Sequence, residues 1–234
     1  MSESRKKEYV FAFKQSVPVF LGYIFLGIAF GLMLQNAGYS YVWAFLISLC
    51  VYAGSMQFVL VTLLTGGASL LTTMIMTLFV NGRHIFYGIS FIEKYKNMGK
   101  LYPYMVYSLT DETYSVLCSL KMPEGLSEKR VSFLISILDH SYWIMGSVIG
   151  ALIGQFITFD STGIDFSMTA LFVVIVVNQW LEHKNHFSTI VGFCTALLAL
   201  ALLGPENFLL PALSLTMIIL LVFRNKTEVQ EDQA

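Results

Sequence analysis

The chain contains a long stretch without a single charged side chain. From Gln15 to Gly82, a run of 68 residues, there is no Asp, Glu, Lys or Arg. One membrane-spanning helix needs only about 20 apolar residues, so this run predicts several consecutive membrane segments. Over the whole chain 12% of the residues are charged, against about 25% in a typical soluble domain. The sequence therefore excludes an ordinary soluble protein and indicates an all-α integral membrane protein.

Eight apolar segments follow one another, and glycine, asparagine or proline residues mark several of the breaks between them. The segments are residues 17–35, 41–64, 68–92, 104–120, 131–158, 166–181, 187–204 and 207–223. The gaps between them have about ten residues or fewer, which leaves no room for an extramembrane domain. We expect a polytopic bundle with a single transmembrane domain over 17–223, a cytoplasmic N-terminal tail over 1–16 and a cytoplasmic C-terminal tail over 224–234.

The distribution of Lys and Arg favours a cytoplasmic N-terminus, because positive residues are retained on the cytoplasmic side. With eight simple crossings, the gaps and tails on the inside hold Arg5, Lys6, Lys7, Lys14, Lys121, Lys129, Arg130, Lys184, Arg224 and Lys226. The outside holds only Lys94, Lys96 and Lys100. These three stop being exceptions if segment 104–120 does not cross and one segment within 41–92 is broken or re-entrant.

Two segments carry polar residues at their centres and favour that second topology. The centre of segment 104–120 reads Thr-Asp-Glu, and the middle of segment 68–92 reads Asn-Gly-Arg-His. Backbone leaves helical geometry at membrane depth only where it is buried in protein or lines a wet cavity. Two topologies remain open: eight full spans, or about six full spans with two broken or re-entrant segments.

Ionisable residues inside the apolar segments are few: Arg83, His84, Asp111, Glu112, Asp139 and His140. An unpaired charge at the bilayer centre costs at least about 2.5 to 3.5 kcal/mol, so such groups usually face a pathway. We predict a polar cavity in which Asp111 or Asp139 exchanges a proton, while Arg83 and His84 supply counter-charge. The alternatives are a buried ion pair that fixes helix register and, for Glu112, a place at the membrane interface.

Uncharged polar residues form a second set of candidates: Ser55, Gln57, Asn81, Asn178 and Gln179. Side-chain amides at membrane depth either bridge helices, which is the commoner outcome, or bind polar groups of a ligand. Ser55 and Gln57 follow Gly54, and a glycine in mid-span favours a broken helix whose free N–H groups can bind a carboxylate. We therefore expect Gln57→Ala to weaken substrate binding; unchanged affinity at normal expression would exclude this role.

Glycines at four-residue spacing provide a third signal. Gly27 and Gly31 form one pair, and Gly146, Gly150 and Gly154 form two pairs in tandem. This spacing places each set on one helix face and lets another backbone approach closely. Packing within the chain is the commoner use, and the tandem set is the candidate for a contact with a partner subunit.

Motifs for other chemistry are absent from the sequence. It has no phosphate-binding loop, no HExxH, no GxSxG and no Cys-x-x-Cys, and its three cysteines are single and widely separated. The basic residues form no continuous face of the kind that nucleic-acid binding requires. We expect no enzymatic activity, no metal, no cofactor and no nucleic-acid partner.

Five stretches resemble the AzlC family, the large subunit of two-component branched-chain amino acid exporters: PVFLGYIFLGIAFG, YAGSMQF, NGRH, TDE and DHSYW. The resemblance extends over roughly residues 16–223. It implies a permease of the bacterial inner membrane that exports valine, leucine and isoleucine, with methionine as a further candidate, together with a small AzlD-type membrane subunit. The polar residues typical of the family correspond here to Ser55, Gln57, Asn81, Arg83, His84, Asp111 and Glu112.

The leading hypothesis is a proton-coupled secondary exporter with a binding site near the membrane midplane. The substrate carboxylate would bind Arg83, Gln57 or backbone N–H groups near Gly54, and its ammonium would bind Asp111 or Asp139. One alternative is a non-transporting assembly subunit in which the polar residues only join helices. Another is an intramembrane aspartyl hydrolase that uses Asp111 and Asp139 as a pair sharing a proton.

Overall fold

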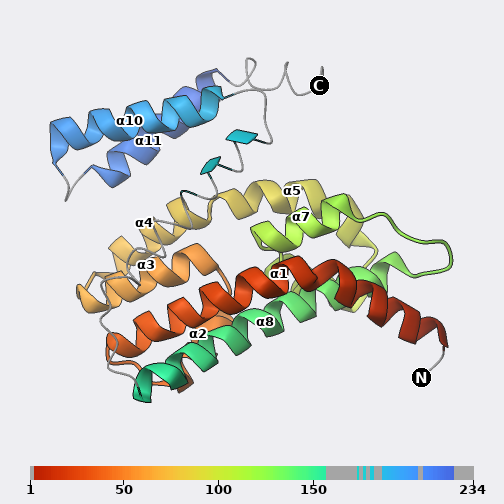
Figure 1. Ribbon diagram of the computed structural model, residues 1–234. Helices are drawn as coiled ribbons and strands as arrows, with labels where there is room; N and C mark the ends of the chain where they lie inside the picture. Colours follow the sequence, from red (N-terminus) through yellow and green to blue (C-terminus); the bar gives the residue numbers. More distant parts are fainter. Residues whose placement is uncertain are drawn as a thin grey trace. The chain divides into compact units, whose positions relative to one another are not determined.

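All elements of the computed structural model, over the residues it describes, are helices (Figure 1). The structure describes residues 3–156, 173, 176–177, 180–181, 186–204 and 208–223. Its elements in chain order are α1 (Glu3–Asn36), α2 (Tyr41–Cys50), α3 (Gly54–Thr65), α4 (Leu70–Asn81), α5 (Arg83–Lys96), η1 (Gly99–Leu101), α6 (Tyr102–Tyr107), α7 (Asp111–Ser119), α8 (Glu128–Phe156), α10 (Phe187–Leu203) and α11 (Leu209–Val222). The chain divides into two compact units, residues 1–168 and 169–234.

The helices lie where the sequence predicts apolar segments, and the all-α prediction is confirmed. Seven of the eight expected segments coincide with described helices. The eighth, 166–181, lies mostly outside the described residues. Two described helices, α1 and α8, are long and apolar enough to cross a membrane, while α2, α3, α4 and α10 are apolar but shorter. The number of full spans and the side of the N-terminus stay predictions.

The first helix begins earlier than the expected boundary between tail and membrane domain. It runs from Glu3, so most of the segment assigned to an N-terminal tail is helical, and Glu8, Ala12 and Ser16 are buried within it. Pro18 lies inside this helix without ending it. The beginning of α1 is therefore part of the packed structure of the first unit.

Three of the expected segments are interrupted in the structure. Segment 41–64 is divided into α2 and α3 by residues 51–53, where Tyr52 has a positive φ of 40°. Segment 104–120 is divided into α6 and α7 by residues 108–110, and Gly82 alone separates α4 from α5. These are the places where Gly54, the Thr-Asp-Glu sequence and the Asn-Gly-Arg-His sequence predict a break. The topology with broken segments expects two such places, one of them within 41–92, whereas the structure interrupts three segments.

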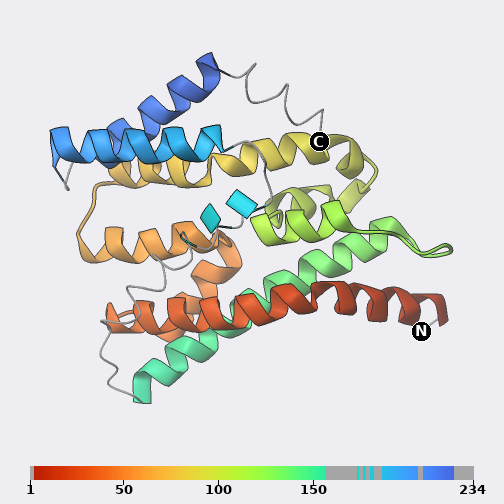
Figure 2. The same cartoon turned by 45° about the horizontal axis from the view of Figure 1, so that its top comes forward.

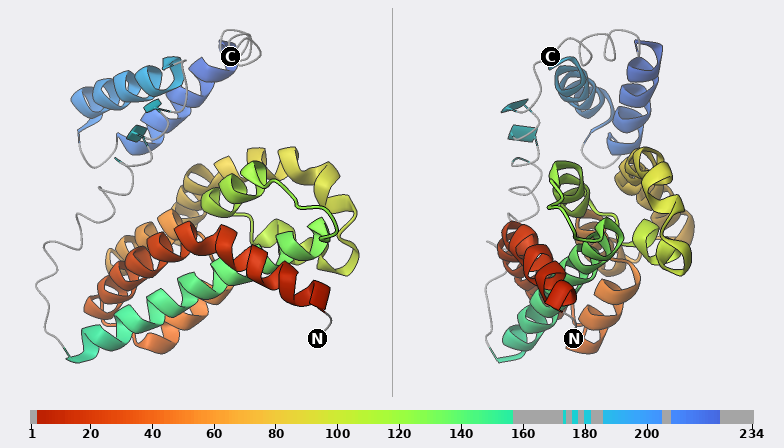
Figure 3. Two further views of the ribbon diagram at one scale, coloured as in Figure 1. Left: turned by 45° about the vertical axis from the view of Figure 1, so that its right-hand side comes forward. Right: turned by 90° about the vertical axis from the view of Figure 1, so that its right-hand side faces the viewer.

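Helices α1 and α8 pack along most of their lengths and run in the same direction (Figures 2 and 3). Their backbones approach closely at Gly27, Gly31, Gly146 and Gly150, which we call the glycine seam, whereas Gly154 faces the side chain of Gln35. A Cβ atom on Gly31 would lie 2.1 Å from the carbonyl oxygen of Ser147, and one on Gly150 would lie 2.1 Å from that of Ile28. Only glycine permits this approach of two backbones. Both glycine sets are thus covered within the chain, and the structure uses them to join α1 to α8.

Other faces of the first unit expose large apolar side chains. On α4 the exposed fractions are 82% for Leu70, 68% for Met74 and 64% for Leu78. A soluble monomer rarely exposes a contiguous apolar face of this kind, which is typical of contact with lipid or with another protein. In the second unit α10 and α11 form a pair, with a hydrogen bond of 2.5 Å between the hydroxyl groups of Thr195 and Thr216.

Candidate functional site

The breaks before α3 and α7 lie against the same part of α1 and α8. Both half-helices begin near each other and run in opposite directions (Figures 1 and 2). Tyr23 of α1 contacts both breaks, because its hydroxyl bonds Thr110 at 2.6 Å and its ring packs on Tyr52 with centroids 6.4 Å apart. Trp143 of α8 packs on the Tyr23 ring at 5.2 Å. Two helix N-termini, each with a positive dipole end, therefore face one buried region.

A chain of hydrogen bonds passes through this region from α8 to α1 and α7. Thr113 donates to Asp139 Oδ2 at 2.8 Å, and Thr110 lies 3.2 Å from Thr113 between their hydroxyl oxygens. Tyr23 lies 2.6 Å from Thr110 and 2.8 Å from Glu112 Oε2. We call Tyr23, Thr110, Glu112, Thr113 and Asp139 the polar centre. It links two carboxyl groups through three hydroxyl groups.

Asp139 is the most deeply buried acid of the polar centre, with an exposed fraction of 0%. Its Oδ1 atom has no hydrogen-bond partner within the described part of the chain. Among the side chains that the structure describes, no Lys, Arg or His forms an ion pair with this carboxyl group. A buried carboxylate in such a setting is costly unless it is protonated or paired with a ligand.

His140 follows Asp139 but has a separate set of partners. Its Nε2 donates to the carbonyl oxygen of Ser48 at 3.2 Å, and Tyr104 donates to its Nδ1 at 3.2 Å. The imidazole also stacks on the ring of Tyr52, with centroids 4.1 Å apart. These contacts attach α8 to the end of α2 and are separate from the hydrogen bond that Asp139 accepts from Thr113.

Gln57 is fully buried and makes three hydrogen bonds to other parts of the chain. Its Oε1 accepts from Trp143 Nε1 at 2.8 Å and from the backbone N–H of Ala53 at 3.2 Å, and its Nε2 donates to Ser48 Oγ at 3.3 Å. The side chain thus joins α2, α3 and α8 around the first break. This is the bridging geometry that competes with the ligand role expected from the sequence.

Asp111 lies at the start of α7 beside His84 of α5. His84 Nε2 is 3.9 Å from Asp111 Oδ1, and its Nδ1 donates to the carbonyl oxygen of Asn81 at 3.1 Å. Arg83 is the first residue of α5; its side chain lies outside what the structure describes. The structure thus brings His84 beside one aspartate, Asp111, whereas Asp139 is bonded by Thr113.

Comparison with known proteins decides the family. The family model described as AzlC protein matches residues 18–157. The Branched-chain amino acid transport protein AzlC of Bacillus subtilis is 36% identical over 94% of this chain and 87% of its own length. The chain belongs to the AzlC family. It is also 42% identical to an uncharacterized membrane protein of Helicobacter pylori, over 95% of this chain and 97% of that protein.

A more distant relative is also similar over most of this chain. The Inner membrane protein YgaZ of Escherichia coli is 27% identical over 88% of this chain and 84% of its own length. No solved structure matches the chain. The names of these relatives support a membrane protein with a transport-related role.

The structure places the candidate residues of this AzlC-family chain in two groups. Asp139 and Glu112 belong to the polar centre, and Ser55 and Gln57 lie buried on the first turns of α3 beside it. Asn81, Arg83, His84 and Asp111 lie around the junction of α4, α5 and α7. Asn178 and Gln179 lie outside the described residues. The aspartates are bonded by different partners, which does not favour a hydrolase that needs them as a pair.

Sequence reasoning missed the hydroxyl groups that connect these acids. Tyr23, Thr110 and Thr113 were not predicted as site residues, although Thr110 begins the sequence Thr-Asp-Glu-Thr that caps α7 by accepting from the Thr113 N–H at 3.3 Å. A capping pattern at membrane depth is a signal that could have identified both threonines. Tyr23 had no local signal, because its partners lie 87 and 89 positions away.

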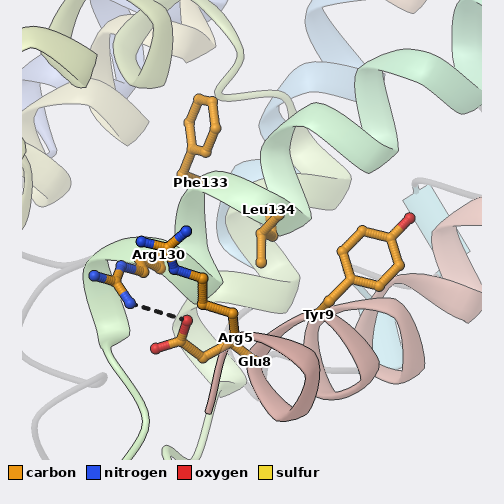
Figure 4. A pocket seen from close by; sticks show the side chains of 6 residues that line it. All are labelled: Arg5, Glu8, Tyr9, Arg130, Phe133 and Leu134. Atoms are coloured by element: carbon orange, nitrogen blue, oxygen red, sulfur yellow. Dashed lines mark hydrogen bonds and ion pairs between the residues drawn. The ribbon is translucent and has the colours of Figure 1, made fainter. Parts of the chain in front are cut away.

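A separate pocket of about 320 Å³ lies at the beginning of α1 and α8. It is lined by Arg5, Glu8, Tyr9, Arg130, Phe133 and Leu134 (Figure 4). Glu8 is buried and accepts from the backbone N–H of Ser127 at 3.1 Å and from Arg130 at 3.5 Å. In this AzlC-family chain the ion pair lies between the ends of the two long helices, and the pocket is lined by none of the predicted site residues.

Proposed function

We propose that this chain is the large subunit of a secondary transporter that exports branched-chain amino acids across the bacterial inner membrane. Valine, leucine and isoleucine are the expected substrates, with methionine as a further candidate, and a small AzlD-type membrane subunit is the expected partner. The relative from Bacillus subtilis, named as a branched-chain amino acid transport protein, supports the substrate class. Export is coupled to proton entry.

One observation carries the proposal: two half-helix N-termini meet at a buried acidic group. Broken helices whose N-terminal ends face a midplane site are typical of secondary transporters that bind anionic groups of their substrates. Here α3 and α7 begin on either side of Tyr23, and Asp139 lies at 0% exposure next to them. This arrangement provides an electropositive and an electronegative side for one small zwitterion.

The substrate's two charged groups have distinct partners in this scheme. Its carboxylate binds the N-terminal end of α3 near Gly54, with Arg83 as a second cationic group. Its ammonium binds Asp139 or Asp111. Aromatic and aliphatic side chains around Tyr52 and Trp143 hold the apolar side chain, and tolerance among substrates follows because one methylene changes binding by only about 1 to 3 kcal/mol.

The same arrangement supports a cytoplasmic N-terminus. Helices α1 and α8 run in the same direction, so Arg5, Lys7, Lys129 and Arg130 all lie at one end of the pair. Gathering of basic residues at one membrane face marks the cytoplasmic side. Under the proposal this end faces the cytoplasm, and the polar centre lies farther along the two helices.

The direct test is efflux of labelled leucine from preloaded proteoliposomes that contain this chain, with and without its small partner, under an imposed pH gradient. Gradient-dependent efflux that requires both chains is the expected result. If neither preparation moves any aliphatic amino acid, the exporter proposal is wrong. If the small subunit alone transports leucine at the full rate, this chain is an assembly subunit instead.

A further inference from the structure

The polar centre contains five oxygen atoms in a row, and their hydrogen atoms can be counted. The oxygens belong to Asp139, Thr113, Thr110, Tyr23 and Glu112, and the four gaps between them are 2.8, 3.2, 2.6 and 2.8 Å. Each gap requires one hydrogen, whereas the three hydroxyl groups provide only three. With both acids ionised, one gap would hold two lone pairs and no hydrogen.

The geometry at Tyr23 shows which gap would lack a hydrogen if both acids were ionised. If Tyr23 donates to Glu112 and Thr110 donates to Thr113, the 2.6 Å contact between Tyr23 and Thr110 has no hydrogen. A distance of 2.6 Å between two hydroxyl oxygens is that of a strong hydrogen bond. A fourth hydrogen, which only a carboxyl group can provide, satisfies all four gaps at once.

We propose that Asp139 and Glu112 share a single proton through the hydroxyl groups of Thr113, Thr110 and Tyr23, which form a proton relay. With the proton on Asp139, each hydroxyl donates toward Glu112; with the proton on Glu112, each donates toward Asp139. Transfer breaks one O–H bond and forms one at every step along the row. The net result is one proton moved between the two acids, with no other atom exchanged.

The two ends of the relay differ in their access to the surroundings. Asp139, Thr113, Thr110 and Tyr23 are buried, whereas Glu112 is partly exposed at the first turn of α7. A proton that enters at Glu112 therefore reaches Asp139 without a water-filled path through the core. The transport role of the relay rests on the proposed exporter function, but the sharing of the proton does not.

Other titratable groups face the relay and take part in setting its charge. Around Asp139 they are His140 and Tyr142 on the same helix, Tyr52 from the first break and Tyr104 from α6. Around Glu112 they are Asp111 beside it and His84 from α5, which also begins with Arg83. None of these groups interrupts the row of five oxygens.

The critical variant is Tyr23→Phe, which removes one hydroxyl from the middle of the relay and keeps the ring. The matched control is Tyr142→Phe, because Tyr142 is another buried tyrosine, on α8, and its hydroxyl bonds Ser16 at 3.1 Å outside the relay. The quantity to measure in the assembled transporter is the ratio of gradient-driven leucine efflux to leucine counterflow. In Tyr23→Phe this ratio should fall at least about tenfold, since loss of a proton-transfer group costs at least this much. Tyr142→Phe should keep the ratio of the unaltered protein.

A second measurement does not depend on transport. Infrared difference spectra of the full chain over a pH titration detect the protonated carboxyl band of Asp139, identified by its loss in Asp139→Asn. With Tyr23 present, Glu112→Gln should shift the pH midpoint of this band; with Tyr23→Phe, Glu112→Gln should leave the midpoint unchanged. If Tyr23→Phe does not fold, Thr113→Val and Thr113→Ser provide the same comparison, because only serine keeps the hydroxyl.

The outcomes separate the two proposals. An Asp139 band that responds to Glu112→Gln equally with and without the Tyr23 hydroxyl overturns the relay. So does a ratio of gradient-driven efflux to counterflow that is the same in Tyr23→Phe and Tyr142→Phe. Absence of leucine movement in the unaltered protein contradicts the exporter proposal alone, and the infrared result then still decides whether the proton is shared.

Discussion

The glycine seam and the polar centre both involve α1 and α8, but their contacts differ in kind. In the glycine seam, backbone meets backbone, with no side chain between Gly31 and Ser147. In the polar centre, side chains from α1, α7 and α8 meet through hydrogen bonds of 2.6 to 3.2 Å. Close backbone packing has a single arrangement. A hydroxyl group, in contrast, can change which neighbour it donates to while its oxygen atom stays in place. We infer that the seam is the fixed frame and that the polar centre is the part that changes state.

The largest expected effect is at the seam. Gly150→Ala would place a Cβ atom 2.1 Å from the carbonyl oxygen of Ile28, so α1 and α8 must separate. We expect the free energy of unfolding to fall by about 3 kcal/mol, the upper part of the range for overpacking. Gly22→Ala is the matched control, because no atom other than those of the neighbouring residues and backbone of α1 lies within 4 Å of its Cβ position. Equal thermal midpoints for the two variants in detergent would contradict the fixed-frame account.

A smaller effect is expected at Gln57, which borders the polar centre. Gln57→Ala leaves the Trp143 indole N–H and the Ser48 hydroxyl without this partner, which should destabilise the protein by about 2 kcal/mol. Gln15→Ala, on the exposed face of α1, should have almost no effect. In a double-mutant cycle with Trp143→Phe, the coupling energy should lie between about 0.5 and 3 kcal/mol. A coupling near zero, together with weakened leucine binding, would restore the ligand role of Gln57.

The smallest effect is expected at the ends of the two long helices. Arg130 is 3.5 Å from Glu8; the Arg130 side chain is 56% exposed, whereas that of Glu8 is 3% exposed. Ion pairs that reach solvent contribute at most about 1 kcal/mol, and Gln keeps a side-chain N–H that can donate to the buried Glu8 carboxyl group, so Arg130→Gln should change the free energy of unfolding by less than that. Chemical unfolding of Arg130→Gln beside Gly150→Ala checks the order of these effects. If Arg130→Gln is the more harmful change, the ion pair and not the seam holds α1 to α8.

Local signals in the sequence predicted the helices and their breaks. Gly54, the Thr-Asp-Glu sequence and the Asn-Gly-Arg-His sequence are short-range features that oppose a continuous helix at membrane depth, and each lies at an interruption in the structure. Their effect is local, so it can be read without knowledge of the tertiary fold.

The partners of the buried side chains could not be predicted in the same way. Gln57 and Trp143 are 86 positions apart, and Tyr23 and Thr110 are 87 apart. Glycine spacing indicated faces for close packing, but it did not say that the faces of Gly31 and Gly150 would cover each other. Such pairs depend on how whole helices cross, which periodicity and spacing along one chain do not specify.

The central claim is that the buried acid Asp139 couples leucine export to proton entry. The most direct measurement compares leucine efflux by the unaltered protein and by Asp139→Asn, each assembled with the small subunit in proteoliposomes, with and without a pH gradient. The account predicts that the gradient accelerates efflux by the unaltered protein and that efflux by Asp139→Asn does not respond to the gradient. Efflux by Asp139→Asn that responds to the gradient as strongly as the unaltered protein would contradict the account.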